Sequence, residues 1–308
     1  MKKIIGYVDW TDFFAHLIED YVPDDLNDDE KKSYNDEKRA RLLNAVKEAN
    51  EKGYEVDLHI LSGGTLEYLY SSGWYDKALE SLVEAGFPDL VKSLTTEYGA
   101  DMVIDGKIIE KPFEQSKKLI NGTLIEEISK TLPDSPNISY PTYKYFQNVR
   151  FEDPDMSEEQ FNEYFDSVKG FKGSENFDLY DYYFPGYGVE IDVLPKGLNK
   201  GRGVFHIEEE FYENIPEEDI AFRIFNGDFY FSEFPMIAAT NSTKILLSGS
   251  EDARYREDRS PQFGPLYTKE TGPIPYVAGE SKLDGFSMAL ESVVKSLPRL
   301  SKETGYKK

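Results

Sequence analysis

The sequence contains no cysteine, and it has three histidines among its 308 residues, His16, His59 and His206. The lack of cysteine excludes disulfide bonds, zinc–thiolate sites and cysteine nucleophiles. The histidines are too scattered along the chain to indicate a histidine-built metal site. Any bound metal is therefore expected to be held by carboxylates, which favours Mg²⁺.

Basic residues are few, because 35 lysines and arginines face 58 aspartates and glutamates, and the formal net charge is −23. Nucleic acids and anionic membranes attract basic surfaces, so we expect neither as a partner. No stretch approaches the roughly 18 consecutive apolar residues that span a bilayer, and the N-terminal apolar run is too short for a secretory signal. We expect a soluble, cytoplasmic protein. A small phosphorylated substrate could still bind through a metal ion and one or two local lysines.

Hydrophobic residues make up 39% of the chain and aromatic residues 14%, which is too much for a disordered chain. Short apolar runs at 4–8, 56–61, 220–225 and 244–247 are typical of buried parallel strands. Helical spacing of apolar residues covers 42–49, 66–70, 77–82 and, at the end, 286–297. The very polar stretch 24–37 is interpreted as a solvated surface insertion. Asp105-Gly106 predicts a β-hairpin between 102–104 and 107–109.

The character of the sequence changes between residues 111 and 195, where proline and aromatic residues become frequent. One helix is expected there at 156–168, with Ser157 to Gln160 as a capping box, between extended pieces. This block is interpreted as an inserted α+β domain covering 111–195. The remaining residues, 1–110 and 196–308, are expected to form one α/β core.

Polar side chains follow the strands at the edge where parallel α/β sheets bind ligands. The first strand ends at Asp9, the second is followed by Ser62, and the strand 220–225 is followed by Asn226-Gly227-Asp228. Lys200 lies in the segment between the second and third of these. A carboxylate can attack phosphorus, a hydroxyl and an ammonium can hold phosphoryl oxygens, and further carboxylates can hold Mg²⁺.

The segments around Asp9, Ser62, Lys200 and Asp228, in this order along the chain, resemble the motifs of the haloacid dehalogenase superfamily. The resemblance is in particular to its sugar-phosphate phosphatase branch, which has a large inserted cap. The segments that carry the resemblance are Tyr7-Val8-Asp9-Trp10-Thr11, Ile60-Leu61-Ser62-Gly63-Gly64, Pro195-Lys196-Gly197-Leu198-Asn199-Lys200-Gly201 and Phe225-Asn226-Gly227-Asp228. The resemblance implies a Rossmann-like core with a parallel sheet and a cap at 111–195. It also implies a Mg²⁺-dependent phosphatase or phosphotransferase that acts on a small phosphorylated metabolite through an aspartyl-phosphate.

The resemblance assigns a role to each matching position. Asp9 is the expected nucleophile, and Ser62 and Lys200 are expected to bind the phosphoryl group. The expected metal ligands are Asp9, the carbonyl oxygen of Thr11, Asp228 and Glu233. Glu280 and Asp284 form a competing pair of metal carboxylates near the end of the chain.

Two departures from the family pattern favour an alternative. Thr11 stands where the phosphatases carry a second aspartate, the general acid and base, and a threonine cannot perform that proton transfer efficiently. The fourth motif is also irregular, because its second carboxylate is displaced by one residue to Glu233. The alternative is a catalytically degenerate protein of the same fold that serves as a binding or interaction module.

Overall fold

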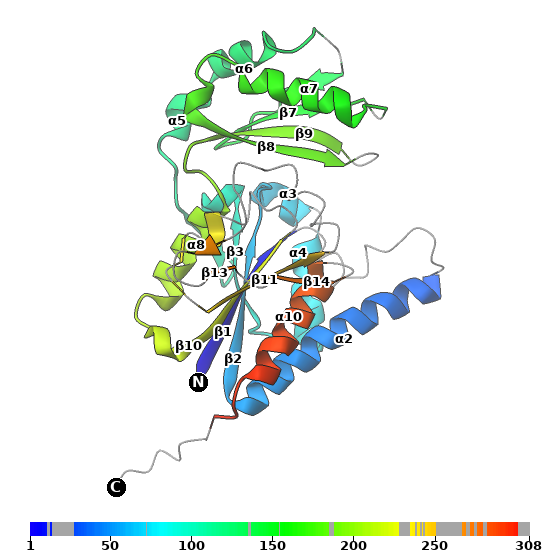
Figure 1. Ribbon diagram of the computed structural model, residues 1–308, viewed down its shortest axis with the longest axis vertical. Coiled ribbons are helices and arrows are strands. Elements are labelled where there is room, and N and C mark those ends of the chain that lie inside the picture. The colour runs from blue at the N-terminus through cyan, green and yellow to red at the C-terminus, as the bar shows by residue number, and fades with distance from the viewer. Residues whose placement is uncertain are drawn as a thin grey trace. The chain divides into compact units, whose positions relative to one another are not determined.

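The computed structural model describes residues 1–10, 13, 28–71, 73–134, 137–153, 155–184, 188–227, 235–237, 239–240, 242, 244–250, 267–268, 272–273, 276–279 and 282–300. The chain divides into two compact units, Met1–Ile109 with Lys200–Lys308, and Glu110–Asn199 (Figure 1). The first is α/β and the second is α+β, so the expected fold class is confirmed. None of the described helices is long and apolar enough to cross a bilayer.

The described residues of the first unit form an eight-stranded sheet in the order β14-β11-β10-β1-β2-β3-β4-β5. Its strands are β1 Lys2–Asp9, β2 Tyr54–Leu61, β3 Val91–Thr96, β4 Asp101–Ile104, β5 Lys107–Glu110, β10 Ile220–Asn226, β11 Ile245–Ser250 and β14 Tyr276–Gly279. All pairings from β14 to β3 are parallel, and β4 runs antiparallel to β3. The four strands predicted from apolar runs are present, whereas β3 and β14 were not predicted.

The hairpin between β4 and β5 follows from its two turn residues. Asp105 has a φ of 50° and Gly106 a φ of 71°. A type I′ turn requires positive φ at both central positions, which aspartate tolerates and glycine prefers. The predicted hairpin is therefore confirmed.

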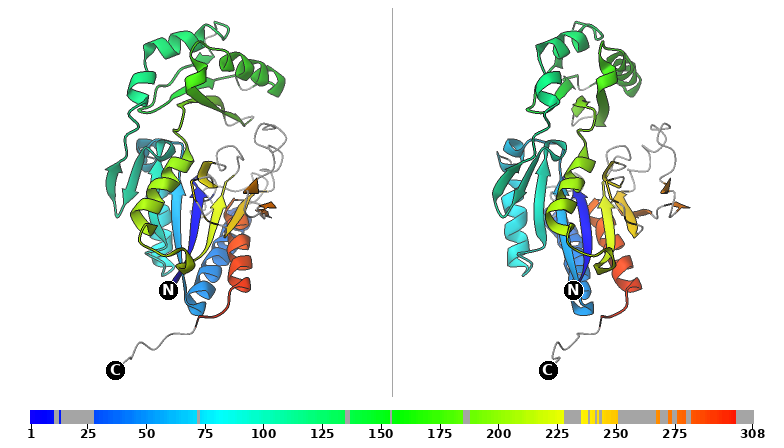
Figure 2. Two further views of the ribbon diagram at one scale, coloured as in Figure 1. Left: turned by 60° about the vertical axis from the view of Figure 1, so that its left-hand side comes forward. Right: turned by 90° about the vertical axis from the view of Figure 1, so that its left-hand side faces the viewer.

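Helices cover both faces of this sheet (Figure 2). One core cluster joins the sheet to α2 Asp28–Lys52, α3 Leu66–Ser71, α4 Trp74–Glu84 and α10 Lys282–Ser296. A second cluster joins the opposite face to α8 Lys200–Ile207 and the π-helical turn η3 Glu208–Tyr212. Strand β1 contributes Ile4 and Val8 to the first cluster and Ile5 and Tyr7 to the second. Burial on both faces explains why β1 is apolar without alternation.

Two helices begin earlier in the chain than expected. The helix expected at 42–49 is part of α2, which begins at Asp28, within the polar stretch 24–37 that was interpreted as a solvated surface insertion. Charged residues such as lysine, arginine and glutamate are good helix formers, so this part can be helical without an apolar stripe. The last helix was expected at 286–297, but it begins at Lys282.

The second unit contains a four-stranded antiparallel sheet in the order β6-β7-β9-β8, again among the described residues. Its elements are α5 Ser116–Leu119, α6 Gly122–Ser129, β6 Ile138–Ser139, β7 Gln147–Phe151, α7 Glu158–Lys169, η2 Ser174–Asn176, β8 Phe177–Phe184 and β9 Gly188–Pro195. Helix α7 begins after Ser157, whose hydroxyl accepts a 3.2 Å bond from the backbone N–H of Gln160. The predicted capping residue is thus in place.

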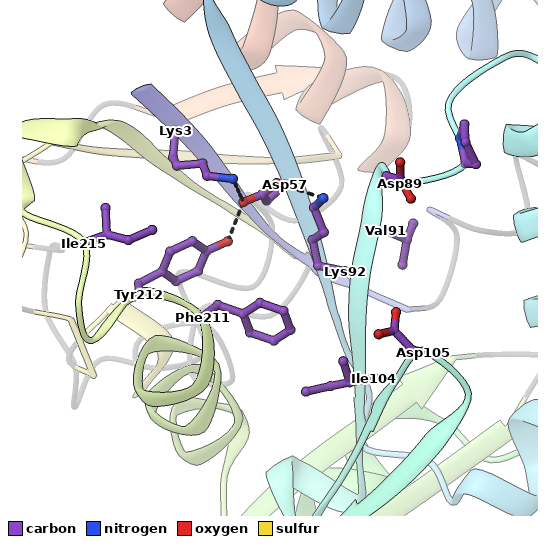
Figure 3. Close-up of a pocket in the computed structure, with 11 residues that line it drawn as sticks. Lys3, Asp57, Asp89, Val91, Lys92, Ile104, Asp105, Phe211, Tyr212 and Ile215 are labelled. Atoms are coloured by element: carbon purple, nitrogen blue, oxygen red, sulfur yellow. Dashed lines mark hydrogen bonds and ion pairs between the residues drawn. The ribbon is translucent and has the colours of Figure 1, made fainter. Parts of the chain in front are cut away.

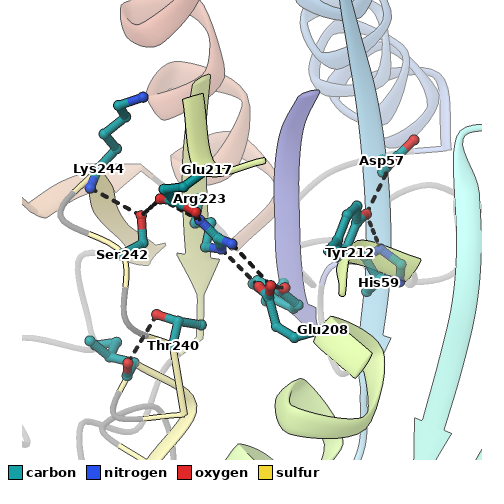
Figure 4. Close-up of polar contacts among 11 residues, drawn as sticks. Asp57, His59, Glu208, Tyr212, Glu217, Arg223, Thr240, Ser242 and Lys244 are labelled. Carbon is teal, nitrogen blue, oxygen red and sulfur yellow. Dashed lines mark hydrogen bonds and ion pairs between the residues drawn. The ribbon is translucent and has the colours of Figure 1, made fainter. Parts of the chain in front are cut away.

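A buried polar network ties the helical layer of α8 and η3 to the sheet (Figure 4). Arg223 on β10 donates to Glu208 at 2.7 and 2.9 Å and to Glu217 at 2.9 and 3.0 Å. The Tyr7 hydroxyl on β1 donates to the same Glu208 carboxylate. The bonds to Glu208 fix the junction of α8 and η3 against β1 and β10.

The second half of this network surrounds His59, which is fully buried on β2. Its Nε2 lies 2.6 Å from the Tyr212 hydroxyl, and that hydroxyl donates to Asp57 at 3.1 Å. Nε2 therefore donates to Tyr212, and Nδ1, 2.8 Å from the Ser93 hydroxyl, accepts from it. Neutral imidazole satisfies both partners. Burial first, and then the charges of Lys92 and Lys3, lower the pKa of His59 to about 3.

This low pKa makes part of the stability dependent on pH. Between pH 6.5 and 3 the unfolded chain binds a proton at His59 that the folded chain does not, so the unfolding free energy falls as pH falls. From pH 7.5 to 5 this group contributes a loss of about 2 kcal/mol. In His59→Gln we expect the loss over that interval, measured by urea unfolding, to be smaller by about this amount. An unchanged pH slope in the variant would contradict the assignment.

Candidate active site

The carboxyl ends of β1, β2 and β10 meet at Asp9. Asp9 lies opposite Leu61 in the β1–β2 register, and Val8 lies opposite Asn226 in the β1–β10 register. Ser62 and Gly227 therefore begin the loops on either side of the point where β1 ends. This edge of a parallel sheet is where α/β proteins bind their ligands.

Asp9 lies between two lysine side chains. Its side chain is 8% exposed, and both carboxylate oxygens accept from ammonium groups: Lys200 Nζ is 2.7 Å from Oδ1, and Lys282 Nζ is 2.7 Å from Oδ2. The backbone N–H of Trp10 also donates to Oδ1 at 3.0 Å. Burial by itself raises the pKa of the Asp9 carboxyl, but the charges of Lys200 and Lys282 outweigh it and lower the pKa below its ordinary value. Asp9 is thus an anion at neutral pH.

Lys200 is the first residue of α8. Two glycines, Gly203 in α8 and Gly99 in the turn after β3, allow this helix to pack close to the sheet. A Cβ added at Gly99 would lie 2.3 Å from the backbone nitrogen of Gly203, and Gly99 has a φ of 86°. A Cβ added at Gly203 would lie 2.8 Å from the Leu61 side chain and 2.9 Å from the Thr95 hydroxyl oxygen. Only glycines permit this approach of backbone to backbone, and the approach places Lys200 at Asp9.

Ser62 is buried in a loop fixed by backbone bonds. Its N–H donates to the Thr95 carbonyl at 2.9 Å, and its carbonyl accepts from the Tyr98 N–H at 3.2 Å. The Ser62 hydroxyl oxygen accepts from the Gly64 N–H at 3.0 Å. An oxygen held in this way by an N–H keeps its own proton for donation to a ligand oxygen.

The structure describes only some of the predicted metal ligands. Thr11, Asp228 and Glu233 lie outside the described residues, as does Glu280 of the competing pair. Asp284, the other member of that pair, pairs with Arg41 of α2. Within the described ranges no group of three or more histidine, cysteine, aspartate or glutamate side chains could hold a metal ion. The described residues alone do not fit a Mg²⁺ site, because Asp9 and Asp284 are the predicted ligands among them, Lys282 binds Asp9 Oδ2, and Asp284 pairs with Arg41.

Lys282 is the site residue that sequence reasoning missed. The last helix was expected to start four residues later, and the carboxylates at 280 and 284 were considered without the lysine between them. Lys282 shares its setting with Lys200, but this setting depends on where each helix begins in the structure. Both lysines are the first residue of a helix in the α/β core, and both helices lead back from the edge where Asp9 lies.

A cavity of about 350 Å³ lies elsewhere in the same unit (Figure 3). It is lined by the Lys3, Asp57, Lys92, Phe211 and Tyr212 side chains, among others. Three of its charged side chains pair with one another, since Asp57 lies 3.1 Å from Lys3 and 3.6 Å from Lys92. Lys3 is near the start of β1 and Asp9 is at its end. This cavity therefore lies at the amino ends of the parallel strands, and the Asp9 site lies at their carboxyl ends.

Comparison with solved structures shows that this chain shares its fold with sugar-phosphate phosphatases, which confirms the fold that the resemblance in the sequence implied. The sucrose-phosphatase of Synechocystis sp. PCC6803 superposes with a TM-score of 0.53 at 10% identity, covering 95% of this chain and 98% of that one. The C-terminal domain of Candida albicans trehalose-6-phosphate phosphatase gives 0.50 at 14% identity, covering 96% and 93%. The haloacid dehalogenase-like hydrolase yhjK of Bacillus subtilis gives 0.45 at 12% identity, covering 96% and 93%.

Sequence comparison adds nothing to this likeness, since no protein-family profile and no curated protein matches the chain. At 10–14% identity the structural likeness establishes the fold and leaves the activity to be argued from the site.

Proposed function

We propose that the protein is a phosphoric monoester hydrolase or phosphotransferase that acts on a small phosphorylated metabolite, such as a sugar phosphate. The observation that carries the proposal is the buried Asp9 carboxylate held between two ammonium groups at the carboxyl edge of the sheet. The sugar-phosphate phosphatases among the structural neighbours support the substrate class. The unit 110–199 is the proposed cap, which would exclude water and select the substrate.

Three residues of this chain, Asp9, Lys200 and Ser62, have proposed roles in the group transfer. An oxygen of the Asp9 carboxylate attacks phosphorus in line, a bond from Asp9 to phosphorus forms, and the bond from phosphorus to the ester oxygen breaks. The Lys200 ammonium, which has three donors, binds a phosphoryl oxygen while it stays near Asp9, and the Ser62 hydroxyl donates to another. The departing alkoxide takes up a proton from solvent. Water or an acceptor alcohol then attacks phosphorus and gives its proton to solvent, while the bond from phosphorus to Asp9 breaks. Phosphate or the new ester leaves, and the Asp9 carboxylate is restored.

Mg²⁺ remains part of the proposal as the expected cofactor. Its ligands would be Asp9, the Thr11 carbonyl oxygen, Asp228 and Glu233, and the ion would supply positive charge to the phosphoryl oxygens. In a panel of sugar phosphates and other phosphate esters, we expect phosphate release that stops when the metal is chelated and returns when Mg²⁺ is added.

The same panel separates the competing function. A degenerate binding module would release no phosphate from any ester and would form no complex with beryllium fluoride, a mimic of the aspartyl-phosphate. It would still bind a phosphorylated ligand, which calorimetry would detect. Absence of both turnover and the beryllium fluoride complex would overturn the proposed activity.

Thr11→Asp should raise the rate of phosphate release by roughly tenfold or more, because general acid–base catalysis typically contributes roughly 10²–10⁴-fold. The added carboxyl would protonate the leaving alcohol and activate the water that hydrolyses the aspartyl-phosphate. The matched control is Thr123→Asp, at an exposed position in the first turn of α6, and it should leave the rate unchanged. If Thr11→Asp releases phosphate no faster than the original protein, the lack of a general acid at residue 11 does not limit the rate.

A further inference from the structure

We propose that Lys282 acts as a built-in cation at the active site, binding Asp9 Oδ2 and competing with a divalent metal ion for that oxygen. The proposal deepens the proposed function and rests on it for the location of the site. Lys282 thereby sets the affinity of the Asp9 site for Mg²⁺. Lys282 is a positioning residue in this account.

The environment of Lys282 is unfavourable for a cation unless an anion compensates. Its side chain is 0% exposed, and burial of an unpaired ammonium is strongly disfavoured. It is also the first residue of α10, where the partial positive charge of the helix N-terminus disfavours a further positive charge. The Asp9 carboxylate, 2.7 Å away, supplies the compensation. The contact with Asp9 therefore stabilises a buried lysine in the first turn of a helix, where a positive charge is least favourable.

The backbone at Lys282 is anchored independently of its side chain. Asn226, fully buried at the end of β10, donates from Nδ2 to the Lys282 carbonyl oxygen at 3.0 Å and to the Ser248 hydroxyl at 3.0 Å. The start of α10 is thereby tied to β10, which is next to β1, and to β11, which follows β10 in the sheet. The Lys282 ammonium thus reaches Asp9 from a fixed point.

Charge then decides how a metal ion can bind. Lys200 Nζ lies 2.7 Å from Oδ1 and Lys282 Nζ lies 2.7 Å from Oδ2, so each oxygen of the Asp9 carboxylate already binds an ammonium group. A divalent cation that binds Oδ2 must displace the Lys282 ammonium from that oxygen and approach against its repulsion. Electrostatic interactions at such distances are strong where water is excluded. The original protein should therefore bind Mg²⁺ weakly at Asp9, and removal of the Lys282 charge should strengthen binding.

The test is titration of the full chain with MgCl₂ in a calorimeter, which needs no substrate and no turnover. In Lys282→Met we expect the dissociation constant for Mg²⁺ to fall by roughly tenfold or more. Lys282→Gln, which keeps a polar tip without the charge, should show the same gain and serves if the methionine variant does not fold. Lys295→Met is the matched control, because Lys295 lies on the same helix with a 68% exposed side chain, and its affinity should stay that of the original protein.

Further variants assign the binding to the site. The gain should disappear in the double variant Asp9→Asn/Lys282→Met, which separates the site from the acidic surface of the protein. Affinity in folded Lys282→Met or Lys282→Gln that is equal to or weaker than in the original protein would overturn the proposal. Because the readout is metal binding, a protein that hydrolyses no ester could still show the gain, so failure of the proposed function and failure of this inference are distinguishable.

Discussion

In Asp9→Asn, phosphate release is expected to fall roughly 10⁴-fold or more, as when the nucleophile of a covalent catalyst is removed. A carboxamide cannot form the bond to phosphorus. It also puts an NH₂ donor toward one of the two ammonium groups that the carboxylate now accepts from. The beryllium fluoride complex should be lost together with the activity.

The substitution also removes a buried charge, so loss of folding must be separated from loss of chemistry. Asp57→Asn is the matched control. Asp57 is 2% exposed on β2 and lies near two lysines, Lys3 at 3.1 Å and Lys92 at 3.6 Å, but at the opposite edge of the sheet. We expect Asp57→Asn to lower the unfolding free energy and to leave kcat nearly unchanged. Activity of Asp9→Asn within tenfold of the original, or an equal loss in folded Asp57→Asn, would refute the assignment of the nucleophile.

In Gly99→Ala, the unfolding free energy is expected to fall by about 3 kcal/mol or more, from overpacking and from a left-handed backbone that disfavours a side chain. The added methyl would lie 2.3 Å from the Gly203 nitrogen, and a backbone atom inside α8 cannot move aside by a rotamer change. Relief requires a shift of α8, which carries Lys200 away from Asp9. A displacement of about 1 Å can lower activity roughly 10²-fold.

Gly86→Ala isolates the contribution of the backbone. Gly86 has a φ of 85°, close to the 86° of Gly99, but nothing lies within 4 Å of an added Cβ there. This control should lose about 1 kcal/mol, the cost of the left-handed conformation alone. Denaturant unfolding and phosphate release would be measured for both variants. Equal losses of stability in the two would show that the contact between Gly99 and Gly203 does not hold α8 in place.

The sequence by itself determined those parts of the molecule that depend on near neighbours in the chain. The apolar runs of β1, β2, β10 and β11, the Asp105-Gly106 turn and the Ser157 cap each follow from the chemistry of a few consecutive residues. The order of strands and helices then indicated the α/β core with an insertion. It also placed Asp9 and Lys200 at one edge of a parallel sheet, where their side chains are in contact.

Other features depend on residues far apart in the chain, and only the tertiary structure decided them. Asp9 and Lys282 are 273 residues apart, and no local pattern marks a lysine that is stabilised by so distant a carboxylate. Their contact exists because Asn226 ties the start of α10 to the strand next to β1. The close approach of Gly99 and Gly203 is of the same kind. Burial and electrostatic pairing act through space, so a side chain whose role comes from a distant partner has no signature in its own stretch of sequence.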